Sequence, residues 1–206
     1  ETLGTDFLLF DFQEVTEILV KGAHHLNRFV REITFFVIEE MYKISDKCGE
    51  EDQKRFIELC DDLIPITAIG LADNWSQVRF AASCATRAFY LFAKSKEELR
   101  AKYDKTMLPR MCLSRYYLAE GVRNYSIESW KIVVEDKGID IITSNPEWFC
   151  EYYISQSLAD NHAVREAACH CISELCSKVA LNDPEPFKPF IDSLLAALID
   201  CFKDQS

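Results

Sequence analysis

The chain has 206 residues, of which 49% are apolar and 28% charged, and its formal net charge is −11. This composition supports a globular protein with a buried core and excludes a low-complexity or disordered chain. The acidic balance argues against nucleic acid and anionic membranes as partners, because both reward basic surfaces. No apolar run approaches the roughly 20 residues that cross a bilayer, so no membrane span is expected.

Helical spacing of apolar residues predicts a chain of helix pairs, and strands have little support. In chain order, the predicted helices are 11–22 and 27–47, 52–71 and 75–94, 96–119 and 121–135, 146–159 and 162–180, and a single helix at 186–203. Pro65 and Pro109 fall inside two of the first helices, and the third pair has a candidate break near Asp104. The only β-like run is short, at residues 139–142.

A Val-Arg dipeptide recurs along the chain at intervals of 48, 44 and 42 residues. Its copies are Val30-Arg31, Val78-Arg79, Val122-Arg123 and Val164-Arg165. Positions 0, 3, 4 and 7 from each valine form one stripe of a helix, and they are mostly small, as in Ala81, Ala82 and Ala85. Small residues there let a neighbouring helix approach closely. The register of the copies indicates an internal repeat.

The order of a turn Asp, a Val-Arg dipeptide and a helix rich in small residues resembles the HEAT repeat of the armadillo-like superfamily, which has about 40–47 residues. The strongest copies are residues 73–82 and 160–168. The resemblance implies an all-α fold, a right-handed α-α superhelix (solenoid) of about four and a half hairpins. It implies one domain over 1–206, part of a longer solenoid. Its repeats would be about 11–47, 52–94, 96–135 and 146–180, with a half repeat at 186–203.

In this family, the turn Asp and the helix Arg form a hydrogen-bonded ladder between neighbouring repeats. By resemblance, the ladder would be formed by Asp73, Arg79, Asp160 and Arg165, with Glu120 and Arg123 as a weaker version. The first repeat departs from the pattern, because Asn27 stands near its turn where the family has Asp.

The second helices are expected to line the concave side of the superhelix, with positions 2, 6 and 9 from each valine pointing outward. This row is Glu32, Phe36, Glu39, Phe80, Cys84, Arg87, Asn124, Glu128, Lys131, Glu166, His170 and Ser173. The candidate partner-binding residues within it are Phe36, Phe80, Arg87, Glu128, Lys131 and His170. Phe36 and Phe80 are candidate anchors, because aromatic residues on a solvent face often mark a binding site. The alternative is that loops or adjacent helices cover them.

The last predicted helix carries a wide apolar surface that includes Phe190, Leu194, Leu198 and Phe202. A closing repeat normally has a polar outer face. We therefore expect further repeats after it or another molecule that covers it, and self-association through this helix is one route. The apolar run at residues 7–10 is a candidate N-terminal cap.

Nine cysteines without a CxxC pair indicate free thiols in a reducing, cytoplasmic setting rather than a disulfide framework or a zinc site. No His is followed by Glu, and neither a GxSxG elbow nor a phosphate-binding glycine loop occurs. We therefore expect no cofactor, no metal and no enzymatic activity.

The leading hypothesis is a non-enzymatic scaffold that binds a partner peptide, helix or protein domain on a curved helical surface. One alternative is a metal-dependent enzyme on a HEAT scaffold, with His24-His25 as a candidate ligand pair. Another is a tubulin-binding domain of the TOG type. That family has a Trp in its first inter-helix turn and basic residues in later turns. Here Trp75 lies in the second turn, and the others offer His25, Gly121 and His162.

Overall fold

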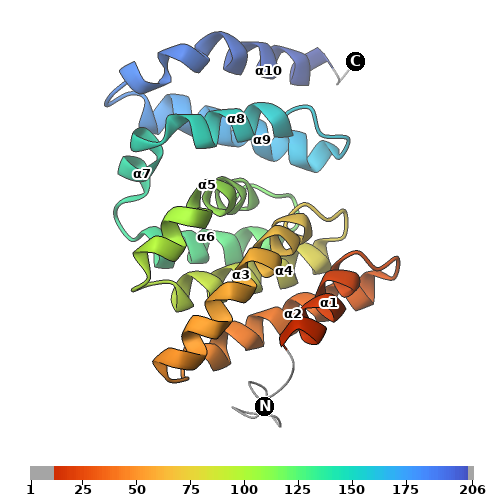
Figure 1. Cartoon of the computed structure of the whole chain (residues 1–206). Helices are drawn as coiled ribbons and strands as arrows, with labels where there is room; N and C mark the ends of the chain where they lie inside the picture. Colours follow the sequence, from red (N-terminus) through yellow and green to blue (C-terminus); the bar gives the residue numbers. More distant parts are fainter. Residues whose placement is uncertain (1–11, 204–206) are drawn as a thin grey trace. The chain divides into compact units, whose positions relative to one another are not determined.

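The computed structural model describes residues 12–203, which are helical with short connections and contain no strand. The all-α prediction is thus confirmed, while the candidate cap at residues 7–10 lies outside the described residues. The helices are α1 (Phe12–Ala23), α2 (Arg28–Ser45), α3 (Glu50–Gly70), α4 (Ser76–Phe92), α5 (Glu97–Ser114), α6 (Glu120–Val134), α7 (Gly138–Ser144), α8 (Pro146–Gln156), α9 (His162–Glu174) and α10 (Ile191–Lys203). A π-helical segment, η2 (Leu175–Val179), follows α9, and a 3₁₀ segment, η3 (Glu185–Phe190), precedes α10 (Figure 1).

Three details differ from the sequence-based prediction. The β-like run at 139–142 lies inside α7, so a β-branched segment is helical here, as tertiary context often dictates. α5 runs unbroken through Asp104 and ends at Ser114, five residues before the predicted end. The last predicted helix is divided into η3 and α10 near Pro189, which has no N–H to donate and restrains the residue before it.

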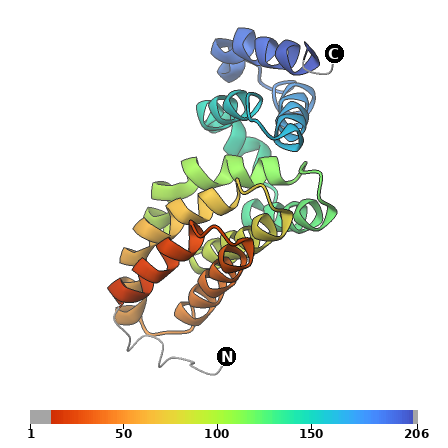
Figure 2. The same ribbon diagram turned by 90° about the vertical axis from the view of Figure 1, so that its right-hand side faces the viewer.

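The chain divides into two compact units, residues 1–104 and 105–206, and the boundary falls within α5. In the first unit α1 packs on α3 and α2 packs on α4. The first helices of the two hairpins, α1 and α3, thus form one layer, and the second helices, α2 and α4, form the other (Figure 2). Between the layers lies an aromatic cluster in which the ring of Tyr42 is 5.3 Å from Phe56 and 5.6 Å from Phe89. Edge-to-face rings of this kind add specific attraction to the burial of their area.

In the second unit α8 and α9 form a hairpin, α10 packs on both of them, and α7 packs on α8. Its core contains the buried rings of Phe149 and Tyr153. This unit also contains a largely buried ion pair, in which the guanidinium of Arg115 donates to both carboxylate oxygens of Glu174. No helix of residues 12–203 is both long enough and apolar enough to span a bilayer.

The stripe that defines the repeat is buried on three helices and open on one. Its residues are buried on α4 and α9 and nearly so on α6, where Tyr125 is half-buried. On α2, by contrast, Val30, Ile33 and Val37 are exposed, Ile33 to 60%. The stripe inferred from the sequence is thus buried as expected on α4, α6 and α9. The expectation is wrong for α2, where three of the four stripe residues are exposed in the described part of the chain.

Candidate functional site

Each repeat arginine holds the turn that precedes its own helix. Arg31 donates from Nη1 to the carbonyl oxygens of His25 at 2.8 Å and Leu26 at 3.1 Å. Arg123 donates from Nη1 to the carbonyl oxygens of Tyr117 and Leu118, and Arg165 donates from Nη1 to those of Ala159 and Asp160. Arg79 donates from Nη1 to the carbonyl oxygen of Leu71 and from Nε to that of Asp73. A guanidinium has several N–H donors in a fixed plane and can therefore satisfy two carbonyls that the end of a helix leaves open.

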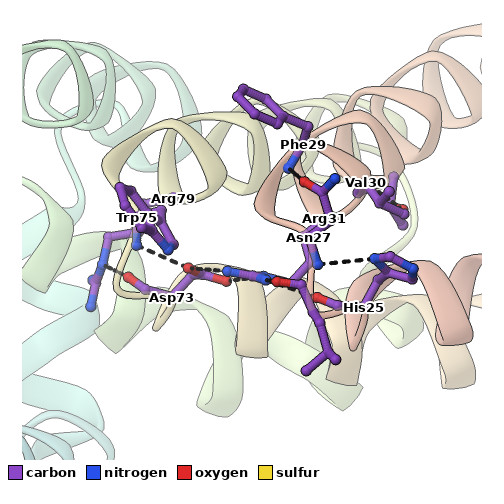
Figure 3. A network of polar contacts seen from close by, with 10 residues as sticks. His25, Asn27, Phe29, Val30, Arg31, Asp73, Trp75 and Arg79 are labelled. Carbon is purple, nitrogen blue, oxygen red and sulfur yellow. Dashed lines mark hydrogen bonds and ion pairs between the residues drawn. The ribbon is translucent and has the colours of Figure 1, made fainter.

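Asp73 joins the two turns of the first unit (Figure 3). Its Oδ2 accepts from Arg31 Nε at 2.7 Å and its Oδ1 accepts from Arg31 Nη2 at 3.1 Å, across 42 residues of sequence. The same Oδ1 accepts the backbone N–H of Trp75 at 2.9 Å, so Asp73 also orders the start of α4. The carboxylate raises the pKa of the Arg31 guanidinium, chiefly through this hydrogen bonding. A two-bond Arg–carboxylate pair fixes geometry as well as charge.

The observed bridge between hairpins thus uses Asp73 but involves Arg31, which the sequence analysis did not assign to the ladder. Arg79 donates to the backbone carbonyl of Asp73. The Val-Arg repeat already contained the missing signal, because Arg31 is its first copy. Asn27 has another role, since its Oδ1 caps α2 by accepting the N–H of Phe29.

The remaining ladder residues lie in the second unit. Asp160 and Glu120 are exposed, and Glu120 Oε1 accepts from Asn124 on its own helix at 3.4 Å. Their arginines, Arg165 and Arg123, hold the local turn carbonyls described above. A side-chain contact between hairpins is therefore observed between Arg31 and Asp73, and the ladder that the family resemblance implies stays a prediction.

Next to the Arg31–Asp73 pair, the turns of the first unit expose an apolar and aromatic surface, which we call the turn patch. The turn patch consists of Leu26, Arg28, Phe29 and Trp75. Leu26 is 98% exposed, Trp75 is 46% exposed, and Phe29 is also exposed. The guanidinium carbon of Arg28 lies 4.0 Å from the Trp75 ring centroid and 4.9 Å from that of Phe29.

Arg28 is held by its aromatic neighbours rather than by a carboxylate. Within residues 12–203 it makes the two ring contacts and no ion pair. A guanidinium stacked on rings loses little side-chain freedom when it binds and keeps its N–H edge for an acceptor. The turn patch can therefore bind an apolar side chain and a carboxylate side by side.

The predicted concave row is less exposed than its pattern suggested. Phe36, Phe80 and Arg87 are half-buried, and Cys84, which was expected to point outward, is buried. In the second unit Glu128, Lys131 and His170 are exposed. The His170 ring stacks on Tyr116 with centroids 5.5 Å apart, and its Nε2 lies 3.9 Å from a carboxylate oxygen of Glu166. Partial burial of Phe36 and Phe80 limits them as anchors, while Glu128, Lys131 and His170 remain accessible.

The candidate ligand histidines have local hydrogen bonds. His24 Nδ1 lies 2.9 Å from the carbonyl oxygen of Val20, and His25 Nδ1 accepts the N–H of Asn27 at 3.0 Å. Over residues 12–203, no three His, Cys, Asp or Glu side chains are grouped to hold a metal ion.

All nine cysteines are free thiols. Burial raises the pKa of Cys60, Cys150 and Cys169 to about 12, which keeps these thiols protonated at neutral pH. A protonated thiol is a poor nucleophile and a poor metal ligand, so these three cysteines act as small apolar residues.

Comparison of the chain with family models, with curated proteins and with solved structures finds no match in any of the three.

Proposed function

We propose that the chain is a non-enzymatic scaffold of HEAT-like repeats, stacked as an α-α superhelix, that binds a protein partner. The internal repeat and the turn arginines support the repeat assignment. Repeat scaffolds of this kind expose rows of turns and helices as binding surfaces.

The observation that carries the proposal is the turn patch. A fully exposed leucine and a half-exposed tryptophan are costly to leave in water, and aromatic and Arg residues are the usual anchors of protein interfaces. The backbone beneath them is held by the Arg31–Asp73 pair, so little order has to be gained on binding. The partner that fits presents a carboxylate next to an aliphatic or aromatic side chain.

The experiment is affinity capture by the immobilised chain, with four proteins compared. They are the wild type, a Leu26→Ser/Trp75→Ala variant of the turn patch, a Phe36→Ala/Phe80→Ala variant of the concave row, and the control Leu181→Ser, which changes another exposed leucine. We expect a protein that the wild type and the control retain and that the turn-patch variant loses. Loss only in the Phe36/Phe80 variant would move the site to the concave row. Equal capture by all four would overturn both sites.

Tubulin is a second candidate partner, because Trp75 is exposed at an inter-helix turn with Arg28 stacked on it. TOG-type domains, which the chain resembles in their repeats, also use a turn tryptophan and basic turn residues. Purified tubulin dimer and the chain should then co-elute in gel filtration, and Trp75→Ala should abolish co-elution. If the two proteins elute separately at every concentration tested, this candidate is wrong, whereas the general scaffold proposal remains to be decided by the capture experiment.

A further inference from the structure

An open apolar groove runs between α1 and α2 and shares Phe29 with the turn patch. Its volume is about 610 Å³. Its walls are the apolar side chains Val15, Ile18 and Leu19 of α1 and Phe29, Val30, Ile33 and Val37 of α2, with Lys21 and His25 at the edge. Ile18 and Ile33 are both exposed to 60%. A continuous apolar face of this kind is typical of a surface that another helix covers.

The repeat itself indicates what covers such a face. Gly70 of α3 lies against Ala82 of α4, and the Phe35 ring of α2 fills the notch above them, 2.4 Å from where a Cβ of Gly70 would stand. The corresponding residues one repeat earlier are Gly22 and Thr34, which also touch, since a Cβ of Gly22 would stand 2.3 Å from Thr34 Oγ1. In the second hairpin this notch is filled by a helix with a phenylalanine. In the first hairpin the same notch is part of the open groove.

Within residues 12–203, α10 has an exposed apolar face that matches this groove. On α10, Ile191, Leu195 and Ile199 are exposed at successive turns, and Phe202 next to them is 75% exposed. Leu194 and Ala197, on its other side, are buried. α10 therefore contacts its own unit with one face and presents an aliphatic stripe with an aromatic ring on the other.

We propose that the groove between α1 and α2 binds α10 of a second copy of the chain, with Phe202 in the notch at Gly22 and Thr34. The lengths agree, because α10 has 13 residues and spans about 20 Å, enough to cover the groove walls on both helices. Charge adds one complementary contact, since Lys21 lines the groove and the exposed Asp192 borders the stripe of α10. The contact is heterologous, which joins copies head to tail.

Sedimentation equilibrium of the full chain tests this proposal. We expect concentration-dependent association that Ile33→Glu in the groove and Leu195→Glu on α10 each weaken by at least about tenfold. Both residues are exposed, so both variants should keep wild-type helicity and melting temperature. The matched controls are Ile69→Glu and Leu181→Glu, which place a charge on exposed apolar residues outside the two faces and should associate like the wild type.

Mixing the two weakened variants gives the sharpest readout. The Leu195→Glu copy retains an intact groove and the Ile33→Glu copy retains an intact α10, so an equimolar mixture should form a one-to-one dimer that neither variant forms alone. Ile18→Glu and Ile199→Glu should repeat the result with a second residue on each face. A monomeric wild type, or variants that fail to complement each other, would overturn the proposal. Failure of complementation with both variants impaired would indicate a symmetric contact. Neither outcome bears on capture through Leu26 and Trp75.

Discussion

α2 and α4 are the second helices of successive hairpins, and their corresponding stripes differ in exposure to solvent. On α4, Val78, Ala81, Ala82 and Ala85 are fully buried under α2 and α3. On α2, the corresponding Val30, Ile33 and Val37 are exposed, and only Thr34 is buried. The covered stripe is mostly alanine, whereas the open stripe consists of larger β-branched residues.

This difference indicates that the size of the side chains on a stripe is related to whether another helix packs on it. Alanine lets a second helix approach until backbones nearly touch, as at Gly70 and Ala82, where a Cβ of Gly70 would stand 2.9 Å from that of Ala82. Ile33 would not fit at such a contact, and it forms the wall of a groove instead. The spacing of the repeat sets which positions form the stripe, and the side-chain volume at those positions limits how closely another helix can approach.

The largest effect should come from the residue of α2 that covers α4. Phe35→Ala removes a fully buried ring from the notch at Gly70 and leaves a cavity, which should lower the free energy of unfolding by about 3–5 kcal/mol. Urea denaturation followed by circular dichroism measures it. Phe29→Ala, which truncates an exposed ring on the same helix, is the control and should change stability by less than about 0.5 kcal/mol. Similar losses in both variants would refute the packing described for α2.

The next effect comes from giving α4 the residue that α2 has at the same position. Ala81→Ile should overpack the fully buried stripe of α4 and cost about 1–3 kcal/mol. The reverse exchange, Ile33→Ala, should cost less than about 0.5 kcal/mol at a protein concentration low enough to keep the chain monomeric. Ala168→Leu extends the test to α9, where the stripe is also buried, with an expected loss similar to that of Ala81→Ile. Unchanged melting temperatures for Ala81→Ile and Ala168→Leu would contradict the register of the repeat.

The sequence allowed the helices and the repeat to be predicted, because both follow from residue spacing. It did not reveal the Arg31–Asp73 bridge, since sequence distance does not say which of several arginines reaches a carboxylate. It gave all four stripes the same role of facing a neighbouring helix, which is wrong for α2, although Ile33 in place of alanine was a usable signal. α7 was missed because its β-branched residues favour a strand locally, whereas its packing against α8, η2 and η3 favours a helix there.

The bridge between the two turns should have a smaller effect than the stripe. Asp73→Asn removes the charge that Arg31 binds and weakens two hydrogen bonds whose side chains are only 15% and 10% exposed. We expect a loss of about 1–2 kcal/mol in thermal or urea denaturation. Asp160→Asn is the matched control, because Asp160 occupies the same place in a later repeat and is exposed, and it should cost less than about 0.5 kcal/mol. Equal losses would show that the carboxylate serves its own turn rather than the link between hairpins.

The smallest expected effect is on stability at low pH, and it involves a carboxylate that only the second hairpin of the first unit has at this position. Asp61 of α3 accepts hydrogen bonds from Lys102 and Tyr103, and these lower the pKa of its carboxyl group, whereas the corresponding position one repeat earlier is Gln13. A lowered pKa means that folding favours the charged form, so this contribution is present above the pKa of the unfolded chain, near 4, and is lost as the pH falls through the lower pKa of the folded chain. Asp61 is 58% exposed in its side chain, which keeps the contribution below about 1 kcal/mol. Between about pH 5 and pH 3, the wild type should therefore lose slightly more stability than Asp61→Asn, and parallel pH profiles of the two proteins would rule out the contribution.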